Sequence, residues 1–161
     1  MPVVLVALAL IILVFGFVQF FGPPYVPTLA HQKEIALDLL DLKTGSTLLE
    51  LGSGDGRVLL AAAKRGYTVV GIELNPLLVL ISYFVTLRYR RQVKIVWGNI
   101  WQKEWPPTDG IFAFLLPKYM PQVDKMLASR GARTKLASHA FAIPMRKADK
   151  EQDGVFLYTY R

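Results

Sequence analysis

The sequence predicts a small, minimal α/β fold in which helices cover both faces of a mostly parallel sheet. One transmembrane helix is expected to precede this domain. Three observations indicate this. Short apolar runs alternate with helical patterns between residues 47 and 160. A glycine-rich loop follows the first of these runs, at residues 52–56, and an almost wholly apolar stretch occupies residues 3–21. We therefore expect a transmembrane anchor at residues 1–22 and a folded domain at residues 23–161.

The apolar stretch at residues 3–21 has Gln19 as its only clearly polar member. As a helix it would be roughly 28 Å long, close to the ~30 Å hydrocarbon thickness of a bilayer. A cleaved signal peptide and an apolar helix of a soluble protein are the alternatives, but the chain starts Met1-Pro2 without a basic residue. Lys and Arg occur only from Lys33 onward, so the positive-inside rule predicts a single-pass membrane protein with its domain in the cytoplasm.

The composition limits the chemistry of the domain. With no cysteine in 161 residues, disulfides and cysteine-based metal sites are excluded, and we expect no metal. The net charge of +7 favours anionic partners. A basic cluster can bind anionic lipid or nucleic acid, or can simply be a solvated helix end. We expect a lipid bilayer as a partner and no nucleic acid. The cluster consists of Arg88, Arg90, Arg91 and Lys94.

The elements of the domain follow in order along the chain. The proline-rich residues 22–28 predict a stiff linker, and Thr28 can cap a helix that ends before Gly45. Alternating patterns then predict strands and helices, with the last strand antiparallel at or near the sheet edge and a charged loop at residues 147–153. The strands are expected at 47–51, 68–73, 92–97, 110–116, 133–141 and 154–160, and the helices at 57–64, 77–90 and 120–129.

The glycine loop places three glycines at alternate positions, Gly52, Gly54 and Gly56, after an acid, Glu50. Glycines let a loop turn sharply, and the helix start behind it offers free N–H groups to a ligand. A dinucleotide-binding fold typically has the motif G-x-G-x-x-G, which this loop lacks. The pyrophosphate of a dinucleotide would also be repelled by Glu50 and Asp55. S-adenosylmethionine carries a sulfonium and an ammonium, which carboxylates attract. The loop therefore favours this cofactor over a dinucleotide or an ordinary surface turn.

Two further positions fit the same cofactor. Glu73 ends the predicted strand 68–73, and its carboxylate can accept hydrogen bonds from both ribose hydroxyls; a solvated strand-end charge is the alternative. Asn99 can hydrogen-bond the edge of an adenine ring while Ile100 and Trp101 pack on the two faces of that ring. The alternative is that Asn99 is a turn residue beside a core Trp. The full set of expected cofactor contacts is Thr28, Glu50, Gly52, Ser53, Gly54, Asp55, Gly56, Glu73, Leu74, Asn75, Asn99, Ile100 and Trp101.

These motifs resemble those of the class I, Rossmann-like S-adenosylmethionine-dependent methyltransferases, through residues 50–57, 71–76 and 99–101. Within that class, the chain resembles the small membrane-anchored protein-lysine methyltransferases that act on the c subunit of ATP synthase and on the adenine nucleotide translocase. Residues 25–28, 114–117 and 138–144 are similar to segments of that family. Asn99 stands where an Asp is usual, and no Trp follows Pro144. The resemblance implies a methyltransferase domain at residues 23–161 that methylates a lysine of a membrane protein.

The acceptor lysine must lose its proton before its nitrogen can attack the methyl group of S-adenosylmethionine, because the protonated ammonium has no lone pair. Desolvation in a narrow apolar channel can lower the lysine pKa without a dedicated base, so we assign no catalytic residue. Neither His31 nor His139 is assigned as a base. The candidates that line this channel are Tyr25, Pro117 and Tyr119, with Thr28 and Phe141 beside them. A methyltransferase acting on a lipid or quinone, and a membrane protein that binds the cofactor without catalysis, are the alternatives.

Overall fold

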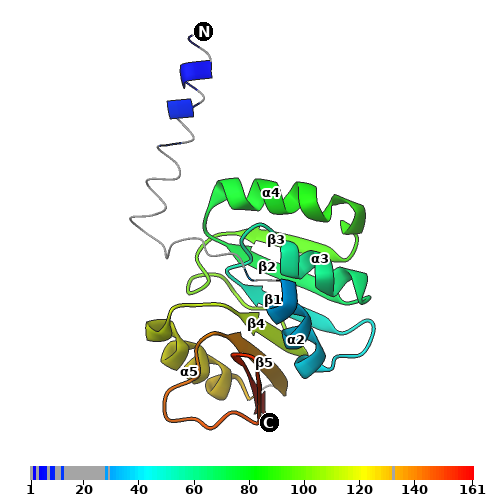
Figure 1. Ribbon diagram of the computed structural model, residues 1–161, viewed down its shortest axis with the longest axis vertical. Helices are drawn as coiled ribbons and strands as arrows, with labels where there is room; N and C mark the ends of the chain where they lie inside the picture. The colour runs from blue at the N-terminus through cyan, green and yellow to red at the C-terminus, as the bar shows by residue number, and fades with distance from the viewer. Residues whose placement is uncertain are drawn as a thin grey trace.

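The structure, a computed structural model, describes residues 2, 4–6, 8–9, 12, 28, 30–131 and 133–161. In this part of the chain, seven strands form one sheet in the order β3-β2-β1-β4-β5-β7-β6 (Figure 1). Strands β1 to β5 are parallel, and β7 pairs antiparallel with both β5 and β6. The strands are β1 Thr47–Leu51, β2 Thr68–Glu73, β3 Val93–Trp97, β4 Gly110–Ala113, β5 Thr134–His139, β6 Lys150–Gln152 and β7 Val155–Tyr160.

Helices cover both faces of the sheet, as the sequence predicts (Figure 1). One face carries α2 (Ala30–Leu40), α3 (Arg57–Lys64) and α4 (Pro76–Thr86), and α4 continues into the 3-10 turn η1 (Leu87–Tyr89). The other face carries α5 (Met120–Arg130), which follows the 3-10 turn η2 (Pro117–Tyr119). The mostly parallel α/β architecture is therefore confirmed.

The core consists of one apolar cluster on each face of the sheet. In β1, Leu48 packs with residues of α2 and α3, whereas Leu49 and Leu51 pack with residues of α5. Successive side chains of a strand point to opposite faces, so a strand covered on both faces needs apolar residues at nearly every position. Glu50 breaks this rule in β1, on the face that carries α2 and α3. A buried acid in a central strand marks a functional position.

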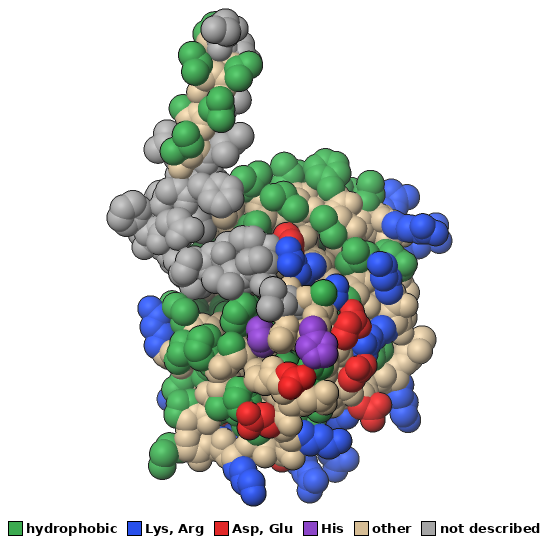
Figure 2. All heavy atoms as spheres, viewed as in Figure 1, with side chains coloured by type: hydrophobic (Ala, Val, Ile, Leu, Met, Phe, Trp, Pro, Cys, Tyr) green, Lys and Arg blue, Asp and Glu red, His purple; other side chains and the backbone are tan. Residues whose placement is uncertain are grey.

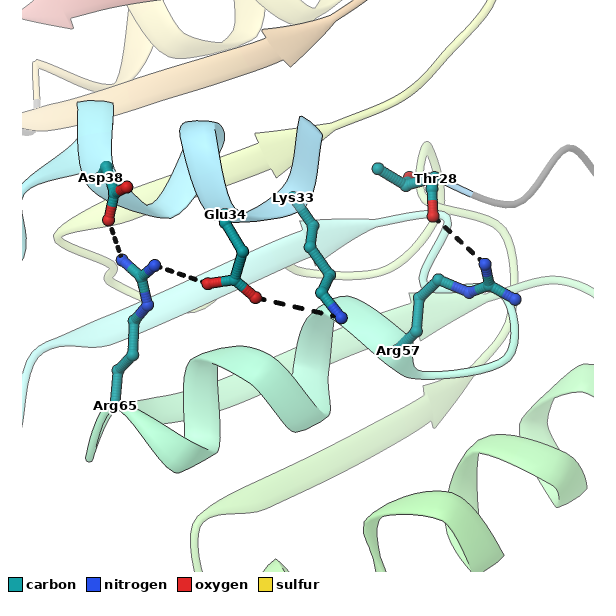
Figure 3. A network of polar contacts seen from close by, with 6 residues as sticks. All are labelled: Thr28, Lys33, Glu34, Asp38, Arg57 and Arg65. Carbon is teal, nitrogen blue, oxygen red and sulfur yellow. Dashed lines mark hydrogen bonds and ion pairs between the residues drawn. The ribbon is translucent and has the colours of Figure 1, made fainter. Parts of the chain in front are cut away.

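Polar contacts hold α2 against α3 (Figure 3). Arg65, just after α3, donates hydrogen bonds to Glu34 and Asp38 of α2 at 2.6 Å each. At the other end of α3, Nη1 of Arg57 donates to the carbonyl oxygen of Thr28 at 3.2 Å. Because Arg57 is also the first residue after the glycine loop, this contact places the start of α2 beside that loop.

Some predicted elements differ from the structure. Residues 147–153 are not only a loop, because Lys150–Gln152 pair with β7 as the edge strand β6. All three residues of β6 are exposed and none is apolar, so β6 has no alternation that a sequence pattern can detect. The helix predicted at 77–90 is α4 followed by η1, and β4 ends at Ala113 instead of residue 116.

The anchor predicted at residues 1–22, with the single-pass membrane localisation and cytoplasmic domain deduced from it, is not supported by the structure. Among the described residues, no helix is both long enough and apolar enough to cross a membrane. A span needs about 20 consecutive apolar helical residues. The remaining residues of that anchor, most of the linker at 22–28 and Tyr25 lie outside the described residues.

Candidate functional site

The candidate site lies at the carboxyl ends of the parallel strands. Strand order reverses at β1, whose neighbours are β2 on one side and β4 on the other, and ligands of open α/β sheets bind at such a switch point. The loop of residues 52–56 begins there. The backbone N–H groups of Gly52 and Ser53 both donate to the carbonyl oxygen of Ile72 in β2, at 2.9 and 3.1 Å. The loop is therefore fixed to the neighbouring strand at its first turn.

All three loop glycines adopt left-handed backbone conformations, with φ of 76° at Gly52, 55° at Gly54 and 82° at Gly56. Gly56 is further restricted by α4. A Cβ atom on Gly56 would lie 2.3 Å from Oγ and 3.1 Å from Cα of Ser82. The loop therefore needs glycine at this position both for its backbone angle and for the close approach of α4.

Glu73 connects the glycine loop to the loop after β2. Its Oε2 accepts a hydrogen bond from the N–H of Gly54 and its Oε1 accepts one from the N–H of Asn75, both at 2.8 Å. The Asn75 side chain in turn caps α4 by accepting from the N–H of Leu77 at 2.9 Å. Glu73 is buried, so it is not a solvated strand-end charge. Each carboxylate oxygen keeps a second lone pair that can accept a ribose hydroxyl.

The two acids of the loop motif have different environments. Glu50 is buried, and its Oε2 has no hydrogen-bond partner within the described residues. Burial raises the pKa of Glu50 well above its ordinary value, and the charges of Glu73 and Asp55 raise it further, while the Leu59 N–H lowers it. Asp55 is instead paired with Arg57, with Oδ2 2.7 Å from Nη2. Glu73 can therefore offer negative charge to a cationic ligand, and a cation beside Glu50 would favour the ionised form of that buried acid as well.

The expected adenine side is formed by the loop after β3. Oδ1 of Asn99 accepts from the N–H of Trp101 at 2.9 Å, so this side chain closes the turn, as one of the two alternatives held. The Nδ2 group of Asn99 is a hydrogen-bond donor, which is the kind of group that an adenine nitrogen accepts from. Ile100 and Trp101 are half-buried, and the carbonyl oxygen of Leu74 accepts from Nε1 of Trp97 at 3.0 Å. The structure thus brings Leu74 close to the end of β3.

The expected acceptor side adjoins the adenine side. The Tyr119 ring lies 5.5 Å from the Trp101 ring, so the loops after β3 and β4 meet there. Pro117 is exposed at the start of η2, whereas Thr28 is buried beside the glycine loop. Tyr25 lies outside the described residues.

The two histidines lie in different environments. The His139 ring at the end of β5 lies against the Phe114 ring, with the ring centroids 4.5 Å apart and the planes tilted by 53°. Burial lowers the pKa of His139, which leaves the ring neutral near neutral pH. Among the described residues, its Nδ1 has no hydrogen-bond partner. His31 is exposed, with Nε2 3.2 Å from Asp153. Neither histidine is shown to act as a base.

The comparisons with known proteins agree with this geometry. Residues 50–150 match the family model of the ANTKMT methyltransferase domain. The chain belongs to this methyltransferase family. The resemblance seen in the sequence motifs is therefore confirmed, because the matched range contains the glycine loop, Glu73 and residues 99–101.

Relatives of this ANTKMT-type domain are named as lysine N-methyltransferases. The lysine N-methyltransferase of the ATP synthase c subunit from Xenopus laevis is 37% identical over 65% of this chain and 46% of its own length. The Caenorhabditis elegans enzyme of that name is 31% identical over 79% of this chain and 71% of its own. The adenine nucleotide translocase lysine N-methyltransferase of Mus musculus is 31% identical, over 75% and 54%. The chain spans less than half the length of the vertebrate c-subunit lysine N-methyltransferases from Xenopus laevis, Homo sapiens and Mus musculus.

Solved structures support the Rossmann-like fold of the domain. An RNA methyltransferase from Salinibacter ruber, in complex with S-adenosyl-L-homocysteine, has a TM-score of 0.76 and 26% identity over 84% of this chain and 92% of that one. A methyltransferase from Thiobacillus denitrificans, also with S-adenosyl-L-homocysteine, has a TM-score of 0.59 and 17% identity, over 77% and 54%. The second likeness shows the fold alone.

Two residues of the ANTKMT-type domain have no role in the sequence analysis but help to build the site. Arg57 balances Asp55 and holds Thr28, and Trp97 anchors Leu74. An acid and an arginine two residues apart at a helix start are a local signal that could have identified the first. The contact of Trp97 joins two separate loops, and neither loop alone indicates it.

Proposed function

We propose that the chain is an S-adenosylmethionine-dependent protein-lysine N-methyltransferase whose acceptor lysine belongs to a membrane protein. One observation carries the proposal: a buried Glu73 holds Gly54 and Asn75, so the loops after β1 and β2 form one acidic cradle. The chain belongs to a methyltransferase family, and its relatives are named as lysine N-methyltransferases of the ATP synthase c subunit and of adenine nucleotide translocase. Membership of that family favours a lysine acceptor.

The residues of the cradle fit this cofactor. When bound, S-adenosylmethionine supplies an electrophilic methyl group on a positively charged sulfur. The unpartnered Oε2 of Glu50 and the second lone pairs of Glu73 offer negative charge and acceptors to such a ligand. A cation near Glu50 favours its ionised form and so offsets the cost of burying that charge. A pyrophosphate would instead add negative charge beside both carboxylates.

The chain's contribution to catalysis is to position and desolvate the acceptor. A lysine ammonium with a pKa of about 10.4 must become neutral before its nitrogen can attack. The adjoining Trp101 and Tyr119 rings offer apolar surface that would exclude water from the amine and lower its pKa. A fixed approach of the amine to the methyl group supplies most of the rate enhancement. This arrangement needs no dedicated base.

Titration calorimetry with S-adenosylmethionine tests the cofactor site. We expect Glu73→Gln to weaken binding about tenfold or more, because one acceptor oxygen becomes an amide that faces a backbone N–H. Glu151→Ala, which removes an exposed acid of β6, is the matched control and should bind like the parent chain. Circular dichroism establishes that both variants are folded. Equal affinity in the folded Glu73→Gln variant would refute the site.

Methyl transfer from tritiated cofactor to membranes tests the acceptor. We expect tritium in a protein band that yields methyllysine after acid hydrolysis. Tritium in the organic extract would favour the rival activity on a lipid or quinone. Tight cofactor binding without any transfer would favour a non-catalytic cofactor-binding protein. A soluble protein labelled as efficiently as a membrane protein would contradict the membrane acceptor and leave the lysine chemistry intact.

A further inference from the structure

The helix α4 presents an apolar face to solvent. Together with η1 it carries six large apolar side chains that are between 38% and 64% exposed, and Phe84 is the most exposed of them. The eleven residues of α4 contain no charged side chain. We refer to these side chains as the α4 patch. They are Leu80, Ile81, Tyr83, Phe84, Val85 and Leu87.

The face of α4 that points into the protein is the more polar one. Ser82 and Thr86 are buried there, and Oγ1 of Thr86 donates to the carbonyl oxygen of Ser82 at 2.8 Å. Small residues are needed at this contact because Gly56 approaches Ser82 closely. Close packing against α3 therefore explains the inner face but leaves the outer one unexplained. Soluble proteins rarely leave a contiguous apolar patch of this kind uncovered.

Basic side chains border the α4 patch at one end. Arg88, Arg90 and Arg91 are all exposed and follow α4 directly. Lys94 is exposed too, but it lies on β3 between Val93 and Ile95, which face the α3 side of the sheet, so it alternates to the other face. Figure 2 shows hydrophobic side chains gathered over α4 and blue Lys and Arg side chains beyond its C-terminal end. Trp97, which is 62% exposed on the edge strand β3, adds an amphipathic aromatic near the other end. Apolar, aromatic and basic side chains together are typical of elements that lie in a membrane interface.

We propose that the α4 patch docks on a lipid surface containing anionic headgroups. The charge argues for this occupant, because the three arginines at the edge of an apolar face match anionic headgroups at the edge of a hydrocarbon layer. A second copy of a chain with net charge +7 would bring no complementary charge. The described N-terminal apolar residues do not cover the patch, since they are 50–67% exposed themselves. They are Val4, Leu5, Val6, Leu8 and Ile12.

The proposed docking has a geometric consequence and does not depend on catalysis. Asn75 caps α4 and also binds Glu73, so the cofactor cradle begins where the docking helix begins. A lipid surface on the α4 patch would therefore lie beside the expected adenine side of the site.

The absence of cysteine allows a direct test on the full chain. A single cysteine introduced as Phe84→Cys is labelled with an environment-sensitive fluorophore, and Ala128→Cys on the exposed side of α5 is the matched control. Phosphatidylcholine vesicles that contain phosphatidylserine are added, with pure phosphatidylcholine vesicles as the neutral comparison. We expect a blue shift and protection from iodide for the label at position 84 with the anionic vesicles, and no change at position 128.

Charge variants test the second half of the proposal. Arg90→Gln and Arg91→Gln should each lower partition of the position-84 label into anionic vesicles about fivefold, which follows from about 1 kcal/mol for each basic side chain near the surface. Lys125→Gln on α5 is the control and should change nothing. A label at position 84 that stays open to iodide on vesicle-bound protein would overturn the proposal. So would a label already protected without vesicles, which indicates that a protein segment or a second copy occupies the patch.

Discussion

The helices α3 and α4 lie side by side on one face of the sheet, yet their side chains are arranged in opposite ways. α3 buries Val58, Leu59 and three alanines, and so follows the usual pattern with apolar side chains inward. α4 buries Leu78 with the two polar residues Ser82 and Thr86, and turns its larger apolar side chains outward.

The contrast follows from the neighbours of each helix. α3 packs against β1, β2 and β3 near the centre of the sheet, where large apolar side chains fill space. α4 packs near the β3 edge of the sheet and against α3, and its contact with Gly56 admits only small side chains. The lesson is that an apolar residue in a helix does not by itself indicate the core. The predictions below test this contrast in order of expected effect.

The largest expected effect is the difference in stability between removing a buried apolar side chain from α3 and removing an exposed one from α4. Leu59→Ala should lower the free energy of unfolding by about 3–5 kcal/mol, because Leu59 is fully buried against the sheet and the cavity cannot collapse. Phe84→Ala removes a larger side chain but should change stability by no more than about 0.5 kcal/mol, since it is exposed. Urea unfolding followed by circular dichroism measures both. Equal losses in the two variants would mean that the outer face of α4 is covered in solution.

The contact between the two helices should give the next effect. Gly56→Ala should cost roughly 2–4 kcal/mol, because alanine is strained at φ 82° and its Cβ would meet Ser82. Ser82→Gly in the same chain should restore part of this loss, since it removes the Oγ and Cβ that a new Cβ would meet. The coupling energy of the double-mutant cycle measures the contact. If Ser82→Gly restores none of the loss, backbone strain alone explains the cost.

The smallest effect concerns two buried polar groups that lack a hydrogen-bond partner among the described residues, Glu50 Oε2 beneath α3 and Ser82 Oγ on the inner face of α4. Burial raises the pKa of Glu50, so the folded protein holds a proton that the unfolded chain releases near pH 4.3. Stability therefore falls as pH rises from about 4.3 through the raised folded pKa. Glu50→Gln should remove this fall and raise the melting temperature by about 2–4 °C on the alkaline side of that window.

The same substitution should weaken cofactor binding, whereas Ser82→Ala should leave binding unchanged. Thermal melts from acid to neutral pH and calorimetry at neutral pH give both readouts. An unchanged pH dependence of melting in Glu50→Gln would show that Glu50 is not the buried acid that titrates.

Local chemistry explains which features the sequence predicts correctly. The glycine loop and the parallel strands depend on neighbouring residues, so the bounds of β1, α3 and β2 agree with the structure. Contacts between distant residues are not predicted, such as Arg57 with Thr28 and Trp97 with Leu74. The edge strand β6 forms through backbone pairing with β7, and its three exposed polar side chains carry no alternation that would predict a strand. The predicted anchor rested on apolar composition alone, and among the described residues no helix is long and apolar enough to cross a membrane.

The carboxylate of Glu73 has a consequence for transplanting this site into another protein. It is the shared acceptor for one amide in each of two loops that are 19 and 2 residues away in the chain. A graft of the glycine loop alone would leave the Gly54 amide without its acceptor, and a graft of the second loop alone would leave Glu73 with one amide instead of two. The two loops therefore have to be transferred together. A chimera that takes only one of them from this protein should lose the hydrogen bonds that fix both loops.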